Sequence, residues 1–110
     1  MRADCTGTAF VFSGRPDPEW QVPAEVRTRL KKIWSALTRG AASALPPAPP
    51  LGYRGCALRC PPDEEWLAYG GVVSHTAASG AVDFRRDPER TFERLLLSTA
   101  PAGALPPKLI

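Results

Sequence analysis

The sequence has 110 residues with 13 Pro and 9 Gly, while its hydrophobic content of 44% and charged content of 23% are ordinary for a globular domain. This composition excludes a coiled coil, a collagen-like repeat and a disordered acidic tail, and no apolar run approaches the roughly 18 residues of a membrane span. The formal net charge of +3 is lower than a dedicated nucleic-acid binder usually carries. We therefore expect one small domain over residues 1–110, with a single core and no membrane partner.

The first expected element is a buried strand over residues 6–12, where β-branched and aromatic residues are frequent. Residues 13–20, SGRPDPEW, follow as a stiff loop, because Pro16 and Pro18 restrict the backbone and donate no hydrogen bonds to a sheet.

An amphipathic helix is expected over residues 23–38, since Pro favours the first helical turn and the apolar residues recur at helical spacing. These apolar residues are Val26, Leu30, Ile33, Trp34 and Leu37. Residues 41–50, AASALPPAPP, then form a Pro-rich spacer inside the domain, because neither flank carries enough apolar residues for a core of its own.

A second strand is expected over residues 56–60, ended by Pro61 and Pro62, with a turn over residues 63–65. Residues 66–75 read as one long strand interrupted at Gly70 and Gly71 by a bulge.

A hairpin loop over residues 76–80 leads to a short returning strand over residues 81–84. The last helix begins with Asp87 as its N-cap and Pro88 as its first residue, and buries Phe92, Leu95 and Leu96 on one face. The element order β-α-β-β-β-α predicts an α+β two-layer sandwich, in which two amphipathic helices cover a small, mostly antiparallel sheet of about four strands.

The most distinctive candidate site combines the loop over residues 13–20 with the turn over residues 52–55. Each segment places an Arg beside a Gly, and two guanidiniums with a Tyr suit a carboxylate or phosphate group. The residues of this predicted site are Ser13, Arg15, Asp17, Trp20, Tyr53 and Arg54. In the competing interpretation the loop is a structural corner, where Asp17 makes a local turn bond and Trp20 packs on the core. The sequence favours a non-catalytic binding domain with a protein partner.

A nucleic-acid-associated protein is the alternative, because cations gather on the first helix and before the second. The residues concerned are Arg27, Lys31, Lys32, Arg85 and Arg86. Aromatic residues do not alternate with these cations, and a solvated helix face explains them equally well.

A hydrolase or thiol enzyme centred on His75 is the third hypothesis, since this is the single histidine. Ser13 with His75 and Asp83, or Cys56 with His75, would supply the residue types, but no nucleophile motif surrounds them. A pocket that placed His75 within about 3 Å of Ser13, Cys56 or an acid would favour catalysis, whereas a His75 alone on a hairpin tip would exclude it.

The cysteines do not form a recognisable metal motif. On an extended strand Cys56 and Cys60 lie roughly 13 Å apart, too far to share a disulfide or a zinc ion. Only a turn that added Cys5 and His75 would create a metal site. No signal segment precedes Cys5, so we expect a cytoplasmic chain, with access to the nucleus, that keeps all three cysteines as thiols and needs no cofactor.

Overall fold

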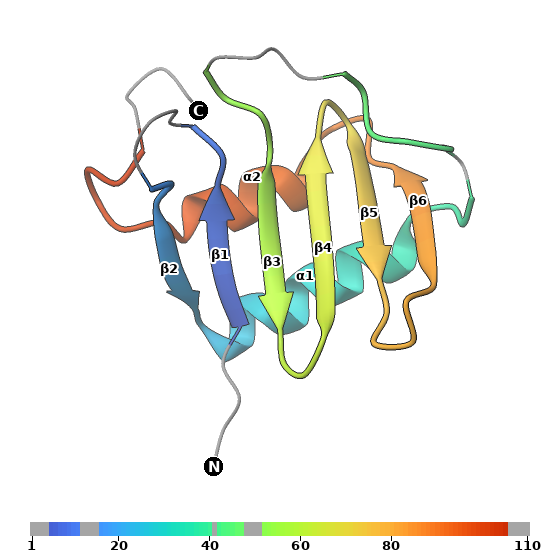
Figure 1. Ribbon diagram of the computed structural model, residues 1–110, viewed down its shortest axis with the longest axis horizontal. Helices are drawn as coiled ribbons and strands as arrows, with labels where there is room; N and C mark the ends of the chain where they lie inside the picture. Colours follow the sequence, from blue (N-terminus) through green and yellow to red (C-terminus); the bar gives the residue numbers. More distant parts are fainter. Residues whose placement is uncertain (1–4, 12–15, 41, 48–51, 106–110) are drawn as a thin grey trace.

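The computed structural model describes residues 5–11, 16–40, 42–47 and 52–105. In this part of the chain, six strands form one antiparallel sheet in the order β2-β1-β3-β4-β5-β6. Both helices lie on one face of that sheet, behind it in the view of Figure 1. The elements are β1 (Cys5–Ala9), β2 (Glu19–Val22), α1 (Ala24–Ala36), β3 (Cys56–Cys60), β4 (Glu64–Tyr69), β5 (Val72–Thr76), β6 (Val82–Arg86) and α2 (Thr91–Ser98). The predicted α+β class is confirmed, but the predicted number of about four strands is too low.

One additional strand is β2, which begins within the segment predicted to be a loop. Its side chains alternate between exposed and buried, with Trp20 and Val22 facing the core. Only four residues carry this alternation, and the Pro16 and Pro18 signals just before it favoured a loop. The first strand is also shorter than predicted and ends at Ala9; residue 12 lies outside the described part of the chain.

The other additional strand arises at Gly70 and Gly71. These residues do not interrupt one long strand but connect β4 to β5, which pair antiparallel with Tyr69 opposite Val72. Both glycines have positive φ, +61° and +84°, as a two-residue hairpin turn of the primed type requires. The predicted turn over residues 63–65 is likewise displaced, because β4 already begins at Glu64.

The first helix follows the prediction closely. It begins after Pro23, buries Leu30 and Trp34, and packs its partly buried apolar residues against the same core. The second helix begins at Thr91, three residues after the predicted first residue, Pro88. Asp87 nevertheless caps the helix across the intervening turn, since its carboxylate accepts hydrogen bonds from the backbone N–H groups of Thr91 at 3.1 Å and Phe92 at 2.8 Å.

The core lies between the sheet and the two helices. Cross-strand neighbours Gly7, Leu58 and Trp66 lie at its centre, and Phe92 and Leu96 of α2 belong to the same buried core. Gly7 is required there because a Cβ atom would come within 2.7 Å of the Trp20 indole nitrogen.

A disulfide joins Cys5, the first residue of β1, to Cys60, the last residue of the antiparallel strand β3. The prediction that all three cysteines remain thiols is therefore wrong for this pair, and Cys56 is the free, buried thiol. Spacing within β3 correctly separated Cys56 from Cys60, but the pairing of Cys5 with Cys60 depends on the sheet register between distant segments. Among the described residues, no helix is long and apolar enough to span a membrane.

Candidate binding site

A hollow of about 530 Å³ lies where β4 turns into β5, a volume typical of ligand sites. Aromatic rings, proline rings and two guanidiniums surround it. We call it the Tyr53 pocket; its lining residues are Pro46, Pro47, Tyr53, Tyr69, Gly70, Gly71, Arg86, Pro88 and Arg90. The combination of apolar walls with a few charged groups is the usual construction of a site that recognises one polar group on a larger apolar ligand.

Tyr53 connects this pocket to the core. Its ring lies 5.8 Å from that of Tyr69, and its hydroxyl donates a hydrogen bond to the carboxylate of Glu93 on α2. Burial raises the pKa of Tyr53 far above its ordinary value, and nearby Cys56 and Glu93 raise it further. Tyr53 is therefore a neutral hydrogen-bond donor at every physiological pH.

Arg90 supplies a guanidinium at the rim in a strained backbone conformation. Its φ of +59° lies in the left-handed region, which costs a non-glycine residue on the order of 1 kcal/mol. Its Nε and Nη2 atoms lie 3.4 and 3.3 Å from the two carboxylate oxygens of Glu93, whose side chain is buried. Hydrogen bonding to Glu93 raises the pKa of Arg90, so the cation persists beside the pocket. Glu93 thus holds both Tyr53 and Arg90 in place.

The predicted site is only partly assembled around this pocket. Ser13 and Arg15 lie outside the described residues. Asp17 accepts a hydrogen bond from the Val11 backbone at 2.9 Å, and its carboxylate lies 3.9 Å from Arg54 Nη2. The loop and the turn therefore do meet, through Asp17 and Arg54.

Trp20 is used inside the fold. It is 6% exposed, and its indole N–H donates a 2.7 Å hydrogen bond to the Thr99 hydroxyl at the end of α2. Its position agrees with the structural-corner interpretation of this part of the loop.

The five cations of the nucleic-acid hypothesis do not share a surface. Arg85 is 9% exposed; its guanidinium stacks 4.0 Å from the Trp34 ring and binds Asp83 and the Trp34 carbonyl. Successive strand residues face opposite sides of a sheet, so Arg86 lies on the face away from α1. Arg27, Lys31 and Lys32 line one shallow depression on α1.

His75 does have an acid within the distance set for the enzyme hypothesis. Its Nε2 atom lies 2.7 Å from Glu64, and its ring packs 4.6 Å from Trp66 and 5.5 Å from Trp34. Cys56 lies two strands away on β3, with β4 between them, so the structure does not bring Cys56 to His75. Asp83, opposite His75 in the register, is bound by Arg85 and the Gly40 N–H. The His75–Glu64 pair therefore meets the distance set for an acid, and the His75 ring also takes part in the packing of α1 on the sheet through Trp34.

Sequence reasoning found Tyr53 but missed Tyr69, Arg90 and Glu93. One signal was available in the sequence. Leu96 and Leu97 follow Glu93 by three and four residues, so all three lie on the same face of α2, and a carboxylate interrupts its buried apolar stripe. A buried carboxylate requires partners, and these are Tyr53 and Arg90.

Among the described residues, no group of three or more His, Cys, Asp or Glu side chains is arranged to hold a metal ion. Burial also raises the pKa of the Cys56 thiol to about 12, so it is a poor metal ligand. Compared with known proteins, the chain matches no family model, no curated protein and no solved structure.

Proposed function

We propose that this protein is a non-catalytic binding domain that recognises a polypeptide partner through an anionic group, a carboxylate or phosphate, bound in the Tyr53 pocket. The observation that carries the proposal is the buried Glu93 carboxylate, which fixes Tyr53 and Arg90 at the wall of a preformed hollow. A guanidinium restrained in this way loses little conformational entropy when it binds a ligand.

The chemistry of the pocket supports an anion attached to an apolar chain. Glu93 occupies one edge of the Arg90 guanidinium, which has five N–H donors in total, so other donors remain for a ligand oxygen. Arg86 adds a second guanidinium, while Tyr69 and the proline rings offer apolar contact to the rest of a peptide. Arg54, which follows Tyr53 in the chain, pairs with Asp17 and so connects this turn to the loop predicted from the sequence.

The test is selection of peptides from a random phage-displayed library on the folded full chain. We expect the selected peptides to share an Asp, Glu or C-terminal carboxylate next to an apolar or aromatic residue. In isothermal titration, exchanging the acid for its amide should weaken binding about fivefold, as loss of a good ion pair does. Phosphorylated and unphosphorylated versions of one selected peptide then distinguish phosphate from carboxylate as the preferred group.

Variants of the protein locate the site. Arg86→Gln should weaken the selected peptides by a similar factor, whereas Arg94→Ala, which removes an exposed guanidinium of α2 outside the pocket, should leave binding unchanged. Selected peptides without acids, or equal effects of these two substitutions, would contradict the proposal.

A further inference from the structure

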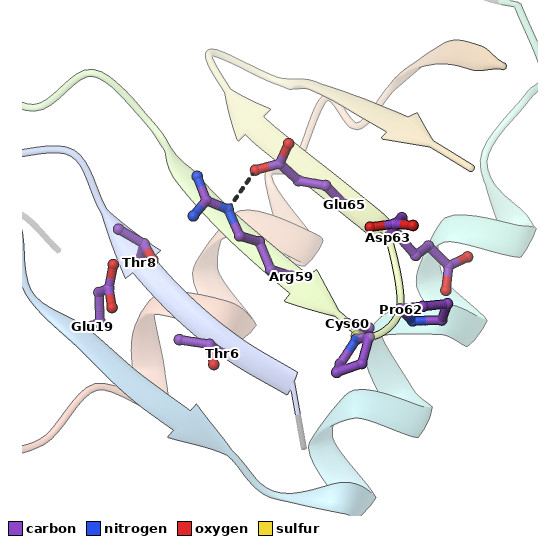
Figure 2. A pocket seen from close by; sticks show the side chains of 10 residues that line it. Thr6, Thr8, Glu19, Arg59, Cys60, Pro62, Asp63 and Glu65 are labelled. Atoms are coloured by element: carbon purple, nitrogen blue, oxygen red, sulfur yellow. Dashed lines mark hydrogen bonds and ion pairs between the residues drawn. The ribbon is translucent and has the colours of Figure 1, made fainter. Parts of the chain in front are cut away.

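A second hollow, of about 450 Å³, lies on the face of the sheet opposite the helices. Figure 2 shows side chains from neighbouring strands around it, close to the turn between β3 and β4. Thr6, Arg59 and Glu65 are successive cross-strand partners, and Thr8 pairs with Glu19 in the next row. Since residues two apart on a strand share a face, both rows project to the same side of the sheet. We call this the acidic hollow.

Carboxylates outnumber cations in the acidic hollow. Its walls hold four acidic residues and a single guanidinium, that of Arg59. The acidic residues are Glu19, Asp63, Glu64 and Glu65. Arg59 binds Glu65 at 2.8 Å, and Glu64 binds His75. Within the described ranges, no hydrogen bond or ion pair engages the carboxylates of Glu19 and Asp63. Arg59 also interacts electrostatically with Glu19. The hollow nevertheless keeps an excess of negative charge, with four carboxylates against one guanidinium on its walls.

Thr8 is the second observation, independent of the acids. It lines the hollow, is 4% exposed, and its hydroxyl has no hydrogen-bond partner among the described residues. A buried hydroxyl without a partner destabilises a fold, and such groups call for a specific explanation. Ionised carboxylates only accept hydrogen bonds, and the Thr8 hydroxyl oxygen can also accept one. The group that suits this part of the hollow is therefore a hydrogen-bond donor.

We propose that the acidic hollow binds a basic side chain, Lys or Arg, of a partner polypeptide. Its ammonium or guanidinium group donates to the Thr8 hydroxyl and pairs with Glu19, the cross-strand partner of Thr8. The rest of the partner chain crosses the hollow toward Asp63 and the rings of Pro61 and Pro62 at the turn. The excess of carboxylates excludes an anion, and the described residues contain no cluster suited to a metal ion.

This site is separate from the Tyr53 pocket. The acidic hollow includes Glu64 and Glu65 at the start of β4, whereas the Tyr53 pocket includes Tyr69 at its end. The two sites bind groups of opposite charge, so either can fail without the other.

The test is a titration of the isotope-labelled full chain, disulfide intact, followed by NMR. The probes are a blocked pentapeptide of Gly and Ser with a central Lys, the same peptide with Arg, and a neutral match with norleucine. We expect saturable shifts of backbone amides over residues 6–8 and 59–65 with the two basic peptides, and no saturable shifts with norleucine.

Three variants complete the test. Thr8→Val keeps the shape of the side chain. It should lower the affinity for the tighter-binding of the two basic peptides about tenfold, which corresponds to one hydrogen bond to a charged group. Glu19→Gln should weaken it about two- to fivefold, as expected for an exposed ion pair. Glu89→Gln changes an exposed acid outside the hollow and should have no effect.

Thermal unfolding of each variant shows whether the fold is intact. If Thr8→Val proves misfolded, Glu19→Gln decides the question by the same criterion. Equal shifts with the Lys and norleucine peptides, or unchanged affinity in Glu19→Gln, would overturn the proposal. So would calcium chloride, if it saturated the same amides while the basic peptides did not.

Discussion

Glu93 shows how a single buried charge can organise a surface. Its carboxylate lies under the first turn of α2, and the groups that satisfy it, Tyr53 and Arg90, are also walls of the Tyr53 pocket. Arg90 adopts a left-handed backbone where glycine would be unstrained. Strain of this kind persists only when the surroundings enforce it, and it concentrates at functional sites. The contacts of Arg90 with buried Glu93 are the surroundings that hold this conformation, and its position agrees with the binding site proposed above.

Cys56, next to this cluster, gives a prediction at the scale of one residue. Burial raises the pKa of its thiol from an ordinary 9.0 to about 12, and the nearby Glu93 carboxylate acts in the same direction. The folded state therefore holds the proton more tightly than the unfolded chain. This contribution to stability is complete below pH 9 and is lost as the pH rises from 9 to 12.

Because the thiolate is the reactive form, iodoacetamide at pH 8 should leave Cys56 of the native protein unmodified. The same reagent should alkylate one thiol per chain in urea without a reductant. Mass spectrometry measures both. Rapid alkylation of the native chain at pH 8 would show that the thiol is accessible and ionised.

At the scale of elements, the sequence predicted regular segments better than short or interrupted ones. The apolar stripe of α1 and the strand Cys56–Cys60 were both correct. Gly70 and Gly71 were misassigned because a glycine pair is compatible with a bulge as well as with a hairpin turn, and only the pairing of Tyr69 with Val72 decides between them. The loop of Asp17 and the turn of Arg54 were combined from the sequence because each places an Arg beside a Gly. Their actual contact depends on sheet order, in which β1 and β3 are neighbours.

The start of α2 provides a prediction for an element. Asp87 is buried and accepts hydrogen bonds from the Thr91 and Phe92 N–H groups, so it satisfies two helix donors that otherwise have no partner. Asp87→Ala should reduce the free energy of unfolding by about 2 kcal/mol, at the upper end for lost caps because the site is buried. Asp87→Asn, which keeps one acceptor oxygen, should recover part of this loss in urea denaturation. Equal stability of the Ala variant and the native protein would show that the cap contributes nothing.

At the scale of the whole molecule, the disulfide links two distant parts of the chain and closes a long covalent loop. Cys5 and Cys60 are 55 residues apart in sequence, and the enclosed segment includes β1, β2, α1 and β3. Restricting an unfolded loop of this size stabilises the native state by about 4 kcal/mol in the chain-entropy model, and measured values are commonly 2–4 kcal/mol.

Replacing both cysteines by Ala, so that no new thiol is left, should therefore lower the unfolding temperature by roughly 10–25 °C for a domain of this size. A reductant should lower the unfolding temperature of the native protein by a similar amount and have no effect on the double variant. Calorimetry with and without reductant measures this difference.

The acidic hollow lies over β1 and β3, the two strands that the disulfide joins. Reduction should therefore lower the affinity for the basic peptides more than the affinity for ligands of the Tyr53 pocket. Equal weakening at both sites would show that the disulfide stabilises the domain uniformly and does not specifically order this end of the sheet.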